Sequence, residues 1–165
     1  MNFVLCGMMG AGKTTVAREL ALLSGRRLVD TDQLISLEYG KISEIFAKHG
    51  EGYFRALEKK VAAFLSEADG LVIATGGGFL LAKENVDRLS KNGKIVYLRA
   101  KKQTLLKRLK KDGERPLLEG EQTLEEKIDG LLKARSAVYE EVSTIIVDVD
   151  DKTPREIAME IEKSL

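Results

Sequence analysis

A glycine-rich stretch directly after a short apolar run constrains the fold of this chain more than any other feature. Residues 7–14 read GMMGAGKT, and residues 3–6 before them read FVLC. This is the pattern Gly-x-x-x-x-Gly-Lys-Thr, which forms a phosphate-binding loop where it links a strand to a helix. Apolar residues at helical spacing follow from Lys13 as far as Ser24 and Gly25, so the required context is present. The alternative, a glycine-rich turn with a chance lysine, does not explain that context.

The residue types of this loop suit the phosphates of ATP. Glycines let backbone N–H groups turn toward phosphate oxygens where side chains would block their approach. The N-terminus of the following helix adds a partial positive charge. Lys13 can neutralise the β- and γ-phosphates, and the Thr14 hydroxyl can bind Mg²⁺ beside the nucleotide. We therefore expect ATP as co-substrate and Mg²⁺ as cofactor, with nucleotide contacts from Gly10, Ala11, Gly12, Lys13, Thr14 and Thr15.

Strands and helices alternate along the rest of the chain. The sequence predicts short strands at 27–30, 71–74, 95–98 and 144–147, and helical periodicity predicts helices at about 33–67, 83–91, 101–110, 123–140 and from Pro154 onward. Within 33–67 we expect a break at Gly40, a cap at Ser43 and a turn at 50–52. The alternation predicts a three-layer αβα fold of class α/β, with a five-stranded parallel sheet and helices on both faces.

Length and composition favour one globular domain. The chain has 165 residues, of which 44% are hydrophobic and 32% charged. A chain of this size can bury roughly two thirds of its unfolded surface in one core. We expect a single domain over 1–165, with substrate-binding helices at about 33–67 and a surface segment at about 111–122.

Charge and cysteine usage limit the partners and the compartment. The net charge of +1 gives no reason to expect binding to nucleic acid or membranes, and no apolar run approaches the roughly 18 residues of a membrane span. The single cysteine, Cys6, lies in the first apolar run, which excludes an internal disulfide and suits a reducing compartment. We expect a cytoplasmic monomer that binds small molecules.

A pair of carboxylates follows the second predicted strand. Asp30 and Asp32 would lie at the carboxyl edge of the sheet, where open parallel sheets bind their ligands. One carboxylate can hold Mg²⁺ through water, and the other can accept a proton from an attacking hydroxyl. A helix cap with an exposed turn explains the same residues equally well, so this motif alone leaves both interpretations open.

Two weaker motifs and two absent ones refine the expected chemistry. Arg55 and Glu58 are one helical turn apart, so Glu58 can orient Arg55. The three glycines at 76–78 can leave backbone amides open to a small ligand, or simply form a tight turn. The chain contains neither an Asn-Lys-x-Asp guanine-reading motif nor an Asp-x-x-Gly switch. These absences favour phosphoryl transfer from ATP over a GTPase switch.

The ordered set of motifs resembles the shikimate kinase family over nearly the whole chain. The resemblance rests on GMMGAGKT at 7–14, DTD at 30–32, FRALE at 54–58, GGG at 76–78, RPLL from Arg115, and Arg135 with Tyr139 four residues later. It implies transfer of the γ-phosphoryl group of ATP to the 3-hydroxyl of shikimate, a step in the biosynthesis of aromatic amino acids.

The resemblance also implies roles for individual residues. Shikimate would be bound by Asp32, Arg55, Gly77, Gly78 and Arg135. Asp32 would also serve as the base, and Asp30 would belong to the magnesium shell. The planar guanidinium forks of the two arginines match a carboxylate, and Gly77 and Gly78 would donate backbone N–H groups.

Three further residues would complete the ATP side. Arg115 would belong to a lid at about 111–122 that excludes water and brings a positive charge to the γ-phosphate. Arg108 would stack on adenine, and Pro154 would form the other wall of that pocket.

Two other functions remain to be weighed against this one. A different small-acceptor kinase, such as a gluconate or nucleotide kinase, would lack a use for the paired arginines and the DTD segment. A non-catalytic ATP-binding regulatory module would not need an intact Lys13, Thr14, Asp32 and Arg115.

Overall fold

A parallel five-stranded sheet forms the centre of the described structure, a computed structural model that covers residues 1–111 and 122–165. The strands are β1 (Asn2–Cys6), β2 (Arg27–Asp30), β3 (Leu71–Ala74), β4 (Gly93–Arg99) and β5 (Ile145–Asp148). Their order across the sheet is β2-β3-β1-β4-β5, and every neighbouring pair is parallel. β1 and β3 are buried along their whole length, as expected for strands covered on both faces. The expected fold class is confirmed.

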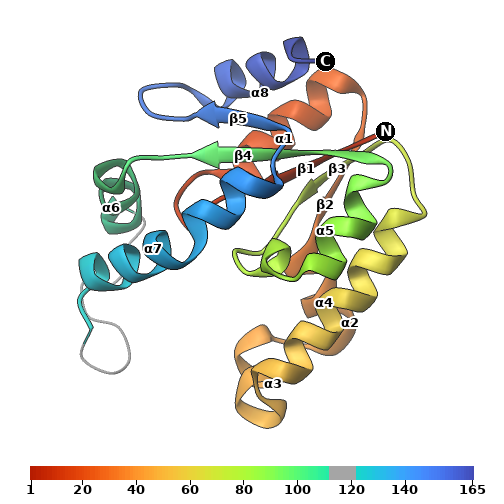
Figure 1. Cartoon of the computed structure of the whole chain (residues 1–165), viewed down its shortest axis with the longest axis vertical. Helices are drawn as coiled ribbons and strands as arrows, with labels where there is room; N and C mark the ends of the chain where they lie inside the picture. Colours follow the sequence, from red (N-terminus) through yellow and green to blue (C-terminus); the bar gives the residue numbers. More distant parts are fainter. Residues whose placement is uncertain (112–121) are drawn as a thin grey trace.

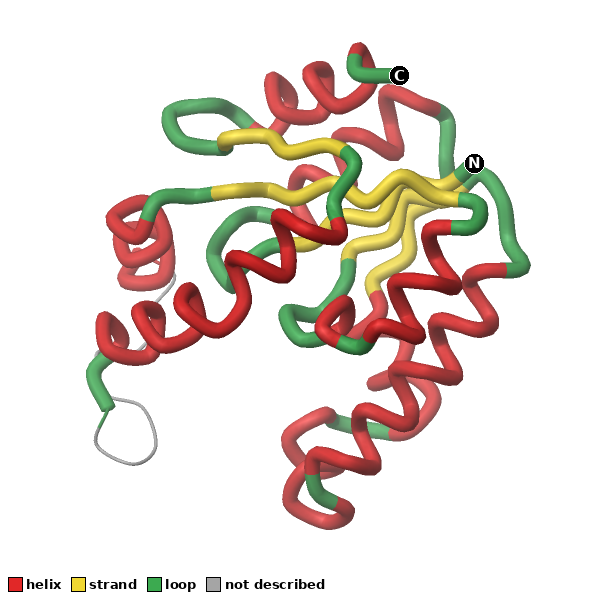
Figure 2. Tube along the Cα trace, viewed as in Figure 1, coloured by secondary structure: helices red, strands yellow, loops and turns green. Residues whose placement is uncertain are grey.

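Helices cover both faces of this sheet (Figure 1). They are α1 (Lys13–Ser24), α2 (Thr31–Tyr39), α3 (Ile42–His49), α4 (Glu51–Ser66), α5 (Lys83–Ser90), α6 (Lys102–Lys111), α7 (Leu124–Val142) and α8 (Pro154–Lys163), with a short 3₁₀ helix η1 (Phe79–Leu81). α1 and α8 pack together on one face, and α4, α5 and α7 lie on the other. Figure 2 shows the strands side by side between these two layers.

The parallel arrangement brings the carboxyl ends of the strands to one edge of the sheet. β1 leads there into the glycine-rich loop, β2 into the start of α2, and β3 into the turn at 76–78. Because β1 and β3 are neighbours and β2 lies beside β3, these three segments meet. In Figure 1 the arrowheads of β4 and β5 point toward the side where α6 and α7 lie. The topology therefore gathers the predicted site residues at one place.

One predicted helix cap is wrong. Ser43 is the second residue of α3, which begins at Ile42 and has Lys41 before it without a side-chain cap. Ile45 is buried and Ile42 packs against the core, so both must lie on the inner face of the helix. The spacing of these apolar residues starts α3 before Ser43, and the cap preference of serine yields to packing.

Other boundaries move by a few residues. α2 begins at Thr31, because the Asp30 side chain accepts a hydrogen bond from Gln33 N at 3.0 Å and caps the helix there. Of the turn expected at 50–52, only Gly50 lies outside a helix, since α4 begins at Glu51. The last helix begins at Pro154, as expected, with a capping box between Thr153 and Glu156.

Cys6 ends β1 beneath the glycine-rich loop. Its thiol is free and buried, and burial raises its pKa to about 12. A thiol that stays protonated in the core is a small apolar packing group. None of the helices in the described ranges is both long and apolar enough to cross a membrane.

Candidate active site

The glycine-rich loop joins the carboxyl end of β1 to the N-terminus of α1. Gly12 precedes α1 with φ 91°, a left-handed conformation that favours glycine. A Cβ atom on Gly7 would lie 2.7 Å from the Leu98 carbonyl oxygen, so the loop can approach β4 only with glycine there. The Lys13 ammonium donates to the carbonyl oxygens of Gly7 at 2.7 Å and Met8 at 3.0 Å. The lysine therefore lies over the loop, where burial lowers its pKa to about 8.

A pocket of about 530 Å³ opens beside this loop. Its lining contains all of the residues expected to contact the nucleotide, namely Gly10, Ala11, Gly12, Lys13, Thr14, Thr15, Arg108 and Pro154. Arg108 comes from α6, and its Nη1 donates to the carbonyl oxygen of Ala11 at 3.0 Å. Pro154 comes from the start of α8. The chain thus brings an anion-binding loop and the two expected adenine walls into one pocket.

A second pocket, of about 440 Å³, adjoins the first. It is lined by Met9, Lys13, Thr14, Asp30, Asp32, Thr75, Gly76, Gly77, Lys127, Leu131 and Arg135. Lys13 and Thr14 line both pockets. A molecule in the second pocket would therefore meet the phosphate end of a nucleotide in the first.

Asp30 and Thr14 form an oxygen-rich corner between the two pockets. The Thr14 hydroxyl donates to Asp30 Oδ2 at 3.2 Å, while Oδ1 of the same carboxylate caps α2. The capping and ligand interpretations of Asp30 are therefore compatible, because each uses a different oxygen. The described residues contain no cluster of three or more acidic, histidine or cysteine side chains that would hold a metal alone. A hydroxyl with one carboxylate fits Mg²⁺, which usually keeps several waters and binds substrate phosphates.

Asp32 lies half-buried in the second pocket. Burial and the neighbouring Asp30 raise the pKa of its carboxyl group, and Lys13 and Arg55 partly oppose the shift. A carboxylate with a raised pKa is a better proton acceptor than one on the surface.

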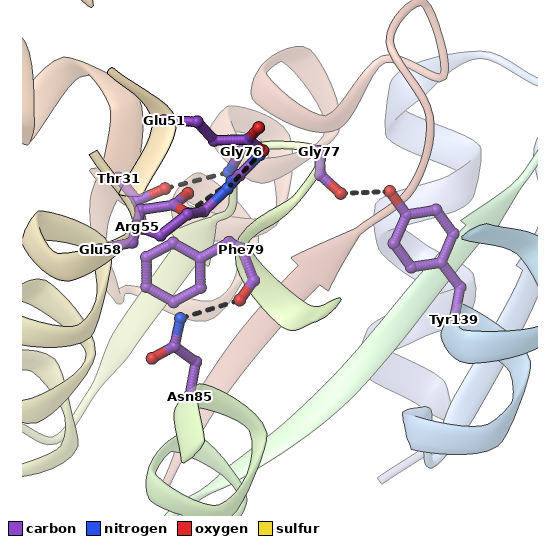
Figure 3. Close-up of polar contacts among 9 residues, drawn as sticks. All are labelled: Thr31, Glu51, Arg55, Glu58, Gly76, Gly77, Phe79, Asn85 and Tyr139. Carbon is purple, nitrogen blue, oxygen red and sulfur yellow. Dashed lines mark hydrogen bonds and ion pairs between the residues drawn. The ribbon is translucent and has the colours of Figure 1, made fainter. Parts of the chain in front are cut away.

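The two predicted carboxylate-binding arginines come from different helices. Arg55 on α4 donates from Nη1 to Glu58 Oε1 at 2.6 Å, as expected from their spacing, and also pairs with Glu51 (Figure 3). Glu58 is only 1% exposed, and burial raises the pKa of its carboxyl group. Arg135 on α7 lines the second pocket. Arg55 and Gly78 lie just beyond that lining, with the Arg55 guanidinium against Gly78.

Some lining residues were not anticipated from the sequence. Lys127, Leu131 and Arg135 are four residues apart along α7, so they share one helix face. That spacing is a signal that could have found Lys127. Lys152, which lines the first pocket from the loop after β5, has no such signal. Arg115 and most of the predicted lid at about 111–122 lie outside the described residues.

Comparisons with known proteins agree on one family. The family model for shikimate kinase matches residues 9–165. Curated shikimate kinases from Caldanaerobacter subterraneus subsp. tengcongensis and Moorella thermoacetica are 42% and 41% identical over 97% and 99% of this chain, and over 93% and 94% of their own lengths. The solved structure of shikimate kinase from Acinetobacter baumannii in complex with shikimate matches with a TM-score of 0.89 and 40% identity, covering 99% of this chain and 91% of that one. Shikimate kinase from Aquifex aeolicus matches with a TM-score of 0.82 and 32% identity, covering 99% and 95%.

Proposed function

Because this chain belongs to the shikimate kinase family, we propose that its two adjoining pockets hold ATP and shikimate, one each. The activity is transfer of the γ-phosphoryl group of ATP to the 3-hydroxyl of shikimate, giving shikimate 3-phosphate and ADP. The observation that carries the two-pocket proposal is that Lys13 and Thr14 line both pockets. The phosphoryl group then passes from the first pocket to the second beside Lys13 and Thr14.

On the ATP side, the glycine-rich loop binds the phosphates through backbone N–H groups and Lys13. Gly10, Ala11, Gly12, Thr14 and Thr15 complete that contact, and Arg108 and Pro154 enclose the adenine. Thr14 and, through water, Asp30 would hold Mg²⁺, a proposal supported by the oxygen-rich corner that they form. Bound there, Mg²⁺ would neutralise charge on the β- and γ-phosphates.

On the acceptor side, Arg55 and Arg135 bind the carboxylate of shikimate. Gly77 and Gly78 donate backbone N–H groups to the same molecule. Two guanidinium groups beside one pocket favour an acidic acceptor over a neutral sugar, because a carboxylate accepts charge-assisted hydrogen bonds from such planar groups. The lining of the second pocket by Arg135 and Gly77 supports this assignment.

The transfer itself needs a proton acceptor and positive charge. As the 3-hydroxyl oxygen attacks the γ-phosphorus, its proton moves to the carboxylate of Asp32, and the bond to the ADP oxygen breaks. Lys13 stabilises the negative charge on the phosphoryl oxygens. We assign Arg115 the same role, within a lid at about 111–122 that closes over both substrates and keeps water from the phosphoryl group.

An acceptor panel tests this function. ADP formation is measured in a coupled assay with shikimate, gluconate and nucleoside monophosphates supplied separately. We expect ADP only with shikimate, and mass spectrometry of the product to give shikimate 3-phosphate. ADP formation with gluconate or a nucleoside monophosphate and none with shikimate would overturn the assignment.

A further inference from the structure

The turn at 76–78 does not need glycine for its backbone conformation. None of Gly76, Gly77 and Gly78 has a φ in the left-handed region, unlike the glycines of the phosphate-binding loop. Gly78, for example, has φ −95° and ψ 0°, which any residue can adopt. The reason for three glycines must therefore lie in the space around them.

That space holds three charged side chains, one against each glycine. A Cβ atom on Gly76 would lie 2.6 Å from Asp32 Oδ1. On Gly77 it would lie 2.6 Å from Arg135 Nη1, and on Gly78 it would lie 2.5 Å from Arg55 Nη1. Such distances are too short for any real Cβ contact, so each side chain can keep its place only beside a glycine. The three groups are the proposed base and the two proposed carboxylate ligands.

Buried polar side chains hold the turn at 76–78 in place through hydrogen bonds (Figure 3). Gly76 N donates to Thr31 Oγ1 at 3.0 Å, and the Tyr139 hydroxyl donates to the Gly77 carbonyl oxygen. Asn85 Nδ2 donates to the carbonyl oxygen of Phe79, just after the turn, at 2.9 Å. Thr31, Tyr139 and Asn85 are exposed by 0%, 1% and 1%. Because the three side chains are buried, their hydrogen bonds hold the turn against the core.

Two of the anchoring side chains, Thr31 and Tyr139, come from the same helices as two of the charged groups. Thr31 directly precedes Asp32 at the start of α2. Tyr139 follows Arg135 by one turn of α7, so both side chains face the same way. On α4, the buried Glu58 holds the Arg55 guanidinium that lies against Gly78. Helix α2 is thus hydrogen-bonded to Gly76, which Asp32 contacts, and α7 is hydrogen-bonded to Gly77, which Arg135 contacts.

We propose that residues 76–78 are a template that sets the relative positions of Asp32, Arg135 and Arg55, and that Thr31 and Tyr139 are positioning residues that hold this template. The proposal rests on the function proposed above. The ring of shikimate keeps its carboxylate and its 3-hydroxyl at a set separation, so the groups that bind them must keep a matching one. A misplacement of about 1 Å can cost roughly 100-fold in rate.

Alanine at Gly77 or Gly78 tests the template directly. Alanine keeps the backbone N–H, and its methyl group meets the movable end of an arginine side chain, so the fold should persist. We expect the KM for shikimate to rise about tenfold or more, as for loss of a charged hydrogen bond, while the KM for ATP stays within about twofold. Gly130→Ala is the matched control, because Gly130 lies on α7 and its Cβ would meet nothing within 4 Å. It should leave both KM values unchanged.

A double-variant cycle separates the template from a merely tight turn. If Gly77 acts through Arg135, adding Gly77→Ala to Arg135→Ala should raise the KM for shikimate no further. Effects that multiply in full would contradict the proposal, because they would mean that the methyl group acts by another route.

Tyr139→Phe tests the anchoring in the same way, with Tyr97→Phe as control. The two tyrosines are both buried and their rings are 5.2 Å apart, but the hydroxyl that donates to the turn belongs to Tyr139. We expect Tyr139→Phe to raise the KM for shikimate about threefold or more, and Tyr97→Phe to leave it unchanged. A lower melting temperature with an unchanged KM in Tyr139→Phe would mark a purely structural role and refute the anchoring.

The outcomes distinguish this proposal from the function on which it rests. A wild-type chain without shikimate-dependent turnover refutes the proposed function. An active wild type, with Gly77→Ala, Gly78→Ala and Tyr139→Phe all at the wild-type KM for shikimate, refutes the template alone. If the glycine variants do not fold, the pair Tyr139→Phe and Tyr97→Phe decides.

Discussion

In the proposed reaction Asp32 accepts the proton of the acceptor hydroxyl, and burial and the neighbouring Asp30 raise the pKa of its carboxyl group. Only the ionised carboxylate can accept a proton, so kcat/KM for shikimate should fall as the pH is lowered through that raised pKa. This acid limb should lie at a higher pH than the usual range of aspartate. The measurement is the pH profile of kcat/KM.

Replacing the carboxylate tests the same residue. Asp32→Asn removes the proton acceptor but keeps the size of the side chain, so kcat should fall about 100-fold or more while ATP still binds. Asp87→Asn is the control, because Asp87 pairs with Lys83 on the exposed surface of α5. Wild-type turnover in Asp32→Asn would exclude a catalytic role for this carboxylate.

The lowered pKa of Lys13 predicts that the enzyme takes up protons when a nucleotide binds. Burial lowers its pKa to about 8, so a large fraction of the free enzyme carries neutral Lys13 above that pH. Phosphates beside the amine favour its charged form, so ATP should draw a proton onto it. Titration calorimetry at about pH 8.5 in two buffers of different ionisation enthalpy should detect this uptake. The same buffer dependence in Lys13→Met would contradict the assignment to this lysine.

At the scale of elements, the positions of strands were more predictable than the starts of helices. The predicted strands at 27–30 and 71–74 coincide with β2 and β3. β3 is buried along its whole length and is continuously apolar, as a strand covered on both faces needs to be. The cap predicted at Ser43 was wrong because serine favours helix caps in general. The packing of Ile42 and Ile45 against the core decides where α3 begins. Lys127 could have been found from its helical spacing to Arg135, whereas Lys152, in the loop after β5, became recognisable as a lining residue only in the folded structure.

The capped start of α8 and the uncapped start of α3 predict different losses of stability on substitution. Thr153 caps α8 by accepting from Glu156 N at 3.2 Å, so Thr153→Ala should cost about 1 kcal/mol of unfolding free energy. Ser43 lies inside α3, so Ser43→Ala should change that free energy by no more than about 0.5 kcal/mol. Urea unfolding of both variants measures the two values. Equal losses would restore Ser43 as a cap.

For the whole molecule, the regular alternation of strands and helices was enough to predict a parallel three-layer fold. It did not predict the strand order, because crossover connections leave open which neighbour each strand takes. That order is what brings the ends of β1, β2 and β3 together and makes one site from residues as distant in the chain as Lys13, Asp32 and Arg135. The chemistry of each motif could therefore be predicted from its own stretch of sequence. That Lys13 and Thr14 line both pockets follows only from the assembled sheet.

The central claim is that the pocket beside Arg135 is the shikimate site. Titration calorimetry of shikimate into the wild type, Arg135→Leu and the control Arg88→Leu tests it most directly, since Arg88 pairs with Glu84 on the surface of α5. We predict that Arg135→Leu weakens shikimate binding by about tenfold or more, that ADP binding persists, and that Arg88→Leu binds as the wild type does. Wild-type affinity for shikimate in a folded Arg135→Leu variant would contradict the account.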